Sequence, residues 1–428
     1  MSVANQVLER YERVIFPAAK PYHEAPLVVS HAKDQYVWDV DDRRYLDFFG
    51  GVLTISCGHC NDEITQRVAN QLRTLQHTTT LYVNEIMVQV AEKVAELTPG
   101  RLEKCYFTNS GSEAIETAIL AARMYTGNST VIALRHGYSG RTLQAMSLTA
   151  HSNWRLGNVV DANVRHVRNP YQYRAPEWLS EDELVELCVE DLEETIATTT
   201  QGKIAAFLAE PIQGVGGFVT PPKSYFERIL PIVRKAGGVF IADEIQTGWG
   251  RTGGKWCGIE HWGVQPDIMT FAKGMANGSP IGCTVAIPEV ADALAGSTFS
   301  TFGGNPVTMA SALATIEYME EHDLPTNAAV RGARLSERLE EFAQEFNFVG
   351  EARGMGLMQG LELVKPGGKE PDPARANAMI DAAKSRGLLI GKGGLYNNVL
   401  RIAPHLNVSA QDIETGCDII AQALVDIS

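Results

Sequence analysis

The sequence lacks the features of a membrane or secreted protein. No uncharged apolar run approaches the roughly 20 residues that a membrane-spanning helix requires, and charges interrupt residues 1–30, so we expect no membrane segment and no signal peptide. Positive charge is also scarce, since 37 basic against 51 acidic residues give a net charge of −14. This balance disfavours nucleic acids and anionic membranes as partners, because both bind to positive patches. It favours a small-molecule substrate.

Cysteine is sparse and odd in number. Seven cysteines in 428 residues predict reduced thiols rather than a disulfide framework, and therefore a cytoplasmic protein. Cys57 and Cys60 have the spacing of a dithiol redox site. We expect an ordinary loop there, because Asn61 or Asp62 fits a helix N-cap and apolar residues follow at helical spacing from Ile64.

Short apolar runs alternate with helical patterns along most of the chain. This predicts an α/β protein with a mainly parallel central sheet that is covered on both faces. Three parts are expected: an N-terminal segment (1–61), a large domain (62–315) and a smaller α+β C-terminal domain (316–428). The expected strands of the central sheet are 104–107, 130–134, 204–208, 238–242, 267–271 and 283–287.

Charged residues follow three of these strands. Glu210 comes just after 204–208, Asp243 directly after 238–242, and Lys273 just after 267–271. Because ligands bind at the carboxyl ends of parallel strands in open α/β sheets, we expect the three side chains on one rim. Each of them alone is more often an ion-pair partner than a catalytic group. Their joint position predicts a site.

A fourth strand, 104–107, leads through a turn of small and hydroxyl residues into a helix. Bare amides at a helix N-terminus bind phosphate with the help of the helix dipole, although Ser110 or Ser112 would also serve as an ordinary cap. A phosphate anchor, a carboxylate and an amine on one rim are what pyridoxal 5'-phosphate requires. We therefore expect this cofactor and no metal.

Six segments together resemble the class III aminotransferases of fold type I, in particular the alanine–glyoxylate and omega-amino-acid aminotransferases. The resemblance spans nearly the whole chain. It implies a fold type I transferase that moves an amino group from an alanine-like or omega-amino acid to a 2-oxo acid such as pyruvate, glyoxylate or 2-oxoglutarate. The segments, in chain order, are Asn109–Ala114, His136–Thr142, Glu210–Gly214, Asp243–Gly253, Phe271–Gly274 and Ser300–Pro306.

The resemblance also implies roles for single residues in the reaction. Lys273 would form the imine with the cofactor and then move the α-proton of the substrate. Asp243 would keep the pyridine nitrogen protonated, Gln246 would contact the phenolic oxygen, and Tyr138 would stack on the ring.

Phosphate binding is implied for a second group of residues. Ser110, Gly111 and Ser112 would bind the phosphate at the start of the helix. Thr301 would reach the phosphate of the neighbouring subunit. Composite sites of this kind imply a homodimer, or a dimer of such dimers.

Four positions bear on the substrate. Arg401 matches the arginine that binds the α-carboxylate in many class III enzymes, with a structural ion pair as the alternative. The ornithine and 4-aminobutyrate enzymes have a glutamate that pairs with this arginine, and the sequence has Val215 there, so Arg401 should stay open. Val52 replaces a glutamine of the dialkylglycine decarboxylases, which favours proton loss over decarboxylation. Arg141 would bind a distal carboxylate or form a positioning ion pair.

Two other functions fit parts of the sequence. A decarboxylase or lyase of the same fold would share the cofactor residues. Gly248–Gly253 spells the glycine fingerprint of a nicotinamide-dependent dehydrogenase, but no helical pattern follows it and the preceding strand already ends at Asp243. An aminotransferase is therefore expected, and tight nicotinamide binding would favour the dehydrogenase.

Overall fold

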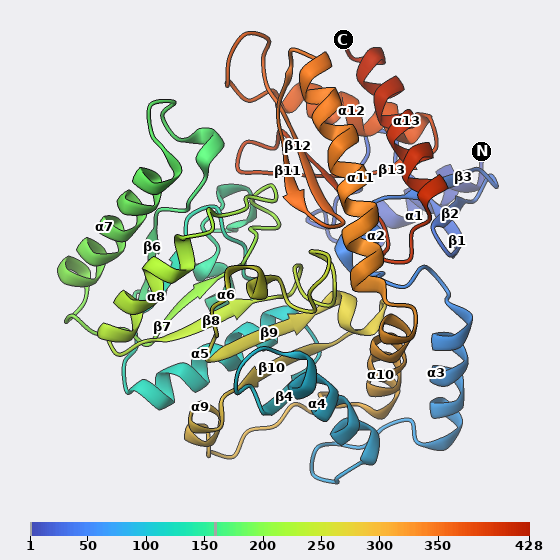
Figure 1. Cartoon of the computed structure of the whole chain (residues 1–428). Helices are drawn as coiled ribbons and strands as arrows, with labels where there is room; N and C mark the ends of the chain where they lie inside the picture. Colours follow the sequence, from blue (N-terminus) through green and yellow to red (C-terminus); the bar gives the residue numbers. More distant parts are fainter. Residues whose placement is uncertain (1, 158–160) are drawn as a thin grey trace.

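The computed structural model describes residues 2–157 and 161–428 of the chain. Its centre is a seven-stranded sheet with the order β4-β10-β9-β8-β7-β5-β6 (Figure 1). All strands run parallel except β10, which is antiparallel to both of its neighbours. The strands are β4 (Lys104–Thr108), β5 (Val131–Leu134), β6 (Val164–Val167), β7 (Ala206–Ala209), β8 (Val239–Asp243), β9 (Ile268–Ala272) and β10 (Gly282–Ala286).

The mainly parallel α/β sheet confirms the predicted fold class. The sequence does not indicate β6, because two of its four residues, Arg165 and His166, are polar and the strand lies at the edge of the sheet. An edge strand has a partner on one side only, so its apolar pattern is weak.

Helices cover both faces of the central sheet. Side chains alternate along a strand, and successive strand residues accordingly belong to two separate apolar cores: Phe207 packs with residues of α7 and α8, whereas Leu208 packs with residues of α5. The helices of this part are α3 (Asp62–Thr74), α4 (Glu85–Leu97), α5 (Gly111–Thr126), α6 (Leu143–Leu148), α7 (Glu181–Thr199), α8 (Tyr225–Lys235), α9 (Pro288–Ala293) and α10 (Pro306–Glu321), with short 3-10 turns η1 (Ser152–Trp154), η2 (Gln172–Arg174), η3 (Gly258–Trp262) and η4 (Lys273–Ala276).

The C-terminal part is a second α+β layer above the central sheet (Figure 1). Its antiparallel sheet has the order β11-β12-β15-β14 and packs against α11, α12 and α13. The sequence does not indicate β11, which contains two glycines and two charged residues, Glu351 and Arg353, on a half-buried strand. The elements are α11 (Leu324–Glu345), β11 (Val349–Met355), β12 (Met358–Leu363), α12 (Pro373–Ser385), β13 (Leu388–Leu389), β14 (Gly391–Gly393), β15 (Val399–Ile402) and α13 (Ala410–Asp426).

The N-terminal strands join the C-terminal part. β13 pairs in parallel with β3, so the first strands and the last helices lie side by side (Figure 1). The division after residue 315 stays a prediction, and α10 runs through this position without a break. The first elements are α1 (Val3–Val14), β1 (Val29–Lys33), β2 (Tyr36–Asp39), β3 (Arg44–Asp47) and α2 (Gly50–Leu53).

The two local alternatives from the sequence find no structural counterpart. The helix after Cys57 and Cys60 begins only at Asp62, and Asn61 caps it by accepting hydrogen bonds from the amides of Glu63 and Ile64, as the sequence predicts. No helix starts in Gly248–Gly253, as a dinucleotide fingerprint would require. In the part of the chain that the structure describes, every helix is too short or too polar to cross a membrane.

Candidate active site

The carboxyl ends of β7, β8 and β9 open into one cavity of about 430 Å³. Glu210, Asp243 and Lys273 follow these strands and all line the cavity. Parallel strands bring their carboxyl ends to the same edge, which explains the meeting of three residues so distant in sequence. The residues singled out in the sequence that line the cavity are Ser110, Gly111, Ser112, Tyr138, Arg141, Asp243, Gln246 and Lys273.

One wall of the cavity is the N-terminus of α5. Ser110 is the N-cap, and its Oγ accepts a hydrogen bond from the backbone amide of Glu113 (3.3 Å). Gly111 and Ser112, the first helical residues, have amides without partners inside the helix. Ser112 Oγ accepts a hydrogen bond from the backbone amide of Arg141 (3.2 Å), which fixes the loop of Arg141 to the helix start. The wall therefore presents an anion site.

Asp243 is a buried carboxylate with one oxygen left for the cavity. Oδ1 accepts hydrogen bonds from the backbone amide of Ile245 (3.1 Å) and from Thr270 Oγ1 (3.5 Å). Among the described residues no hydrogen bond occupies Oδ2. Burial raises the pKa of Asp243, and the backbone hydrogen bond from Ile245 and the charge of Lys273 act against this rise. A cationic group in the cavity would stabilise the ionised form.

Lys273 has a φ of 45°, in the left-handed region that residues other than glycine rarely adopt. Strain of this kind persists where the surrounding structure imposes it, often at functional sites. Burial lowers the pKa of the Lys273 amine, and the Arg401 guanidinium lowers it further, against the opposing charges of Asp243 and Glu210. A lowered pKa increases the fraction of neutral amine, which is the nucleophilic form.

Arg401 reaches the site from β15 in the C-terminal part. Its buried guanidinium lies over the rings of Phe49 (5.4 Å) and Phe218 (4.9 Å). Nη2 donates a hydrogen bond to Gln246 Oε1 (2.6 Å), while Nε has no partner within the described part of the chain. No described carboxylate forms an ion pair with it, which argues against the structural alternative. The guanidinium is thus an unpaired cation next to the cavity.

The backbone of Val215 lies close to the side chain of Arg401, as the resemblance to class III aminotransferases implies. A β-carbon at Gly393 would be 2.7 Å from Arg401 Cδ and 3.0 Å from the carbonyl oxygen of Val215. The glycine therefore lets the chain at position 215 and the stem of the arginine approach each other. Val215 itself is buried and carries no charge that could compete for the guanidinium.

Three predicted residues do not line the cavity: Arg401, which contacts it only through its hydrogen bond to Gln246, and Thr301 and Val52. Thr301 is exposed in a turn whose Ser300 accepts a hydrogen bond from the side-chain amide of Asn109 (3.1 Å). Val52 is half-buried in a turn with a φ of 67°. Neither residue lines the cavity of its own chain.

The chain matches a known protein family along nearly its whole length. The family model described as aminotransferase class-III matches residues 18–424. The chain belongs to the class III aminotransferases. It is 41 % identical over 413 residues to the mitochondrial alanine–glyoxylate aminotransferase 2 homolog 2 of Arabidopsis thaliana, covering 96 % of this chain and 85 % of the relative.

Other relatives of this class III aminotransferase carry the names of different activities. A leucine/methionine racemase of Thermococcus litoralis is 37 % identical, with 99 % of this chain and 96 % of the relative covered. The solved structure of an (S)-enantioselective omega-transaminase from Thermomicrobium roseum is 33 % identical, with a TM-score of 0.92 over 100 % of this chain and 99 % of that chain. The enzyme is accordingly a transaminase by family, and the family uses pyridoxal phosphate.

The cavity of the aminotransferase fits this cofactor in its chemistry. The start of α5 offers amides for a phosphate, Asp243 Oδ2 accepts no hydrogen bond from any described residue and could meet a protonated ring nitrogen, and the pKa of Lys273 is lowered as an imine-forming amine requires. A β-carbon at Gly111 would lie only 2.7 Å from Ile245 Cδ1, so the wall is closely packed beside the expected phosphate.

Sequence reasoning placed Glu210 on the rim but assigned it no role. Its carboxylate accepts hydrogen bonds from the backbone amides of Tyr138 (2.9 Å) and Gly214 (2.7 Å). Burial raises the pKa of Glu210, and the charge of Asp243 raises it further. Glu210 thereby fixes the backbone that carries Tyr138. The signal that could have found this role is its position after a strand, which it shares with Asp243.

Proposed function

We propose that the chain uses pyridoxal 5'-phosphate to move an amino group from an alanine-like or omega-amino acid to a 2-oxo acid such as pyruvate, glyoxylate or 2-oxoglutarate. The observation that carries the proposal is one cavity lined by the Lys273 amine, the Asp243 carboxylate and the start of α5. The alanine–glyoxylate aminotransferase name of the Arabidopsis relative supports the substrate class.

The residues of the cavity would hold the cofactor at three points. When bound, pyridoxal phosphate supplies an aldehyde that takes up the amino group and a ring that accepts electrons. Residues 110–112 would bind its phosphate, and Asp243 would keep a proton on its pyridine nitrogen. Gln246, whose Oε1 accepts from Arg401, would donate from Nε2 to its phenolic oxygen, and Tyr138 would cover the ring.

Lys273 and Arg401 would act on the amino acid itself. Lys273 would hold the cofactor covalently through Nζ, and its displaced neutral amine would take the proton from the substrate's Cα. Arg401 would bind the α-carboxylate as a bidentate pair. Holding the carboxylate fixes which bond at Cα faces Nζ, so binding and proton transfer depend on the same orientation.

We further propose a homodimer with composite sites. Thr301 is exposed, and its neighbour Phe302 (60 % exposed) and the residues Leu81 (70 %), Tyr82 (70 %) and Val83 (86 %) are large apolar side chains left open to solvent. Apolar surface of this kind supports a protein interface. A cytoplasmic location stays a prediction, because the Arabidopsis relative is named as mitochondrial.

The direct test is cofactor attachment followed by one half-reaction. Borohydride reduction of the protein with pyridoxal phosphate, followed by peptide mapping, should label Lys273. Addition of L-alanine without an acceptor should release one pyruvate per site and stop, and glyoxylate should then restore the starting absorption. A label on Lys203 or Lys255, or turnover that needs no acceptor, would contradict the proposal.

Racemisation is the second candidate, because a 37 % identical relative is named leucine/methionine racemase. A racemase also removes the Cα proton, but it returns the proton to Cα and needs no acceptor. L-Leucine and L-methionine incubated with the holoenzyme without a 2-oxo acid should keep their chirality, as followed by chiral chromatography. Conversion to an equal mixture of enantiomers would favour the racemase.

A further inference from the structure

The loop between β3 and α3 contains an unusual left-handed turn. Four successive residues, Gly50 to Leu53, have φ values of 53°, 59°, 67° and 58°. Valine and leucine avoid this region because the β-carbon meets the backbone, so the turn needs contacts that impose it. It also adjoins the site, since a β-carbon at Gly274, the neighbour of Lys273, would be 3.6 Å from the carbonyl oxygen of Leu53.

Asp47 holds the start of this turn. Its Oδ1 accepts hydrogen bonds from the backbone amides of Phe49 and Gly50, both at 2.9 Å. The side chain is buried, so a carboxylate there requires further partners for its second oxygen. The groups beside that oxygen are His59, from the same loop region, and His405, from the C-terminal part of the chain.

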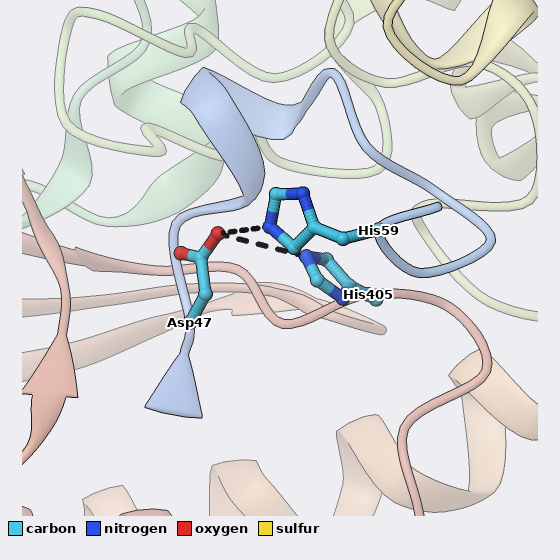
Figure 2. A group of neighbouring side chains, drawn as sticks. All are labelled: Asp47, His59 and His405. Atoms are coloured by element: carbon cyan, nitrogen blue, oxygen red, sulfur yellow. Dashed lines mark hydrogen bonds and ion pairs between the residues drawn. The ribbon is translucent and has the colours of Figure 1, made fainter. Parts of the chain in front are cut away.

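Figure 2 shows Asp47, His59 and His405 facing one another. His59 Nε2 donates to Asp47 Oδ2 at 2.9 Å, and His405 Nε2 lies 3.7 Å from the same oxygen. Burial alone would raise the pKa of Asp47, but the two imidazoles hold it well below its usual range. His405 is 0 % exposed, and its ring packs against Gly50, where a β-carbon would be 3.3 Å from Cδ2.

The same three side chains are also a possible ligand set for a metal, because their donor atoms lie within 4.8 Å of one another. Two ligands bound to one tetrahedral Zn²⁺ at about 2.1 Å are roughly 3.4 Å apart. The 2.9 Å contact between His59 and Asp47 is instead the length of a direct hydrogen bond. The His59–Asp47 contact therefore favours a direct hydrogen bond over a shared metal, and His405, whose ring nitrogens have no hydrogen-bond partner in the described part of the chain, lies beside this pair at ion-pair distance.

The network is connected to Arg401 by two routes. The ring of Phe49, whose backbone amide is bound by Asp47, forms one of the two aromatic walls of the guanidinium. The chain after β15 is bound to the same loop: the amide of Ala403 donates to the Phe48 carbonyl and the amide of Leu406 donates to the Ser56 carbonyl, both at 2.7 Å. His405 lies between these two bonds.

We propose that Asp47, His59 and His405 are positioning residues that fix Arg401 for the carboxylate of the substrate, through the backbone and ring of Phe49. The inference rests on the proposed function, in which Arg401 binds that carboxylate. It makes substrate selection depend on three residues that do not line the cavity. A loosened network would let the Phe49 wall move and leave the guanidinium without a fixed direction.

The test uses His59 because one substitution removes its hydrogen-bond donor and a second substitution keeps a donor in a side chain of different shape. His59→Leu removes the donor to Asp47, whereas His59→Gln keeps an amide that donates from nearly the same distance. Each holoenzyme is assayed in single turnovers with L-alanine and with ethylamine, which lacks the carboxylate. We expect His59→Leu to lower kcat/KM for alanine about tenfold to hundredfold, mainly through KM. Ethylamine should change less than about threefold, and His59→Gln should restore most of the loss for alanine.

Controls separate this inference from general destabilisation. His322→Leu removes an exposed histidine 3.9 Å from Glu63 and should leave both substrates unaffected. Equal losses for both substrates, or failure of His59→Gln to restore activity, would show a purely structural role and overturn the proposal. Zn²⁺ detected by elemental analysis of the purified protein, bound in proportion to sites and lost in His59→Leu, would overturn it as well.

Arg401→Ala measured in parallel distinguishes a failure of the carboxylate site from a failure of the positioning network. If Arg401→Ala lowers alanine and ethylamine equally, the proposed carboxylate site is wrong. If Arg401→Ala discriminates between them and His59→Leu does not, only the positioning network is wrong. If the network acts through Arg401, adding His59→Leu to Arg401→Ala should cause no further loss for alanine.

Discussion

At the scale of single residues, position 215 controls how open Arg401 is. Val215→Glu would place a carboxylate beside a buried guanidinium that has no ion-pair partner among the residues the structure describes, and the two should pair. The substrate carboxylate must then displace this pair. We expect the KM values for glyoxylate and pyruvate to rise about tenfold to hundredfold. They are measured in the second half-reaction, which starts from enzyme that already carries the amino group. Val215→Gln has the same size without charge and should change them far less; equal effects would show that bulk rather than charge matters.

Burial lowers the pKa of Lys273, and the charge of Arg401 lowers it further. The positive guanidinium favours the neutral amine and lowers its pKa. Arg401→Gln removes this charge, so the pKa of Lys273 should rise. The rate at which the cofactor-free protein binds pyridoxal phosphate covalently depends on neutral amine, and its pH profile should therefore move to higher pH. The exposed substitution Lys255→Gln should not move it, and an unchanged profile in Arg401→Gln would assign the shift to burial alone.

Single residues differ in how well the sequence predicts them. Asp243 and Lys273 could be placed on one rim because each follows an apolar strand, and strand ends meet. Phe49 and Phe218 could not be placed beside Arg401, because no local pattern states which distant segments pack together. The partnership of Asp47 with His59 and His405 was missed for the same reason.

At the scale of elements, apolar runs predict strands but not their direction. The strand β10 is buried at every position, like β9 beside it, although it is antiparallel to β9. A strand buried on both faces has the same apolar pattern in either direction, so the sequence does not reveal the reversal. The left-handed turn Gly50–Leu53 was also missed, because valine and leucine disfavour positive φ and only tertiary contacts impose it. Local preference and final conformation disagree there, next to the site.

The start of α5 gives a prediction about phosphate binding. Gly111→Ala would place a β-carbon 2.7 Å from Ile245 Cδ1, so the helix start or Ile245 must shift. Overpacking of this kind costs about 1–3 kcal/mol, and we expect the Kd for pyridoxal phosphate to rise by about fivefold to hundredfold. Ile245→Val removes the contacting methyl group, and the double variant Gly111→Ala/Ile245→Val should recover most of the affinity. Fluorescence titration measures both, and no recovery would indicate that the glycine serves another purpose.

At the scale of the whole molecule, Thr301 raises the question of which site it serves. It is exposed and absent from the cavity of its own chain, while large apolar side chains beside it are open to solvent. An isologous homodimer would bury such a surface and bring each Thr301 toward the cavity of the other subunit. This geometry can be tested without a structure of the dimer, because it determines how damaged subunits combine.

Two damaged subunits distinguish the arrangements. Lys273→Ala abolishes proton transfer in its own cavity, and Thr301→Asp places a negative charge near whichever phosphate Thr301 meets. If Thr301 serves the partner's site, a heterodimer of the two variants has one site with both defects and one fully intact site. If Thr301 serves its own site, each site of the heterodimer has one defect and none is intact.

Differently tagged variants, co-expressed and purified as heterodimers, should show about half of the wild-type activity per dimer if Thr301 serves the partner's site. Heterodimers of Lys273→Ala with the wild type provide the reference for one intact site. Activity no higher than that of Thr301→Asp alone would place Thr301 in its own subunit's site, and a fully active monomer in sedimentation would exclude shared sites altogether.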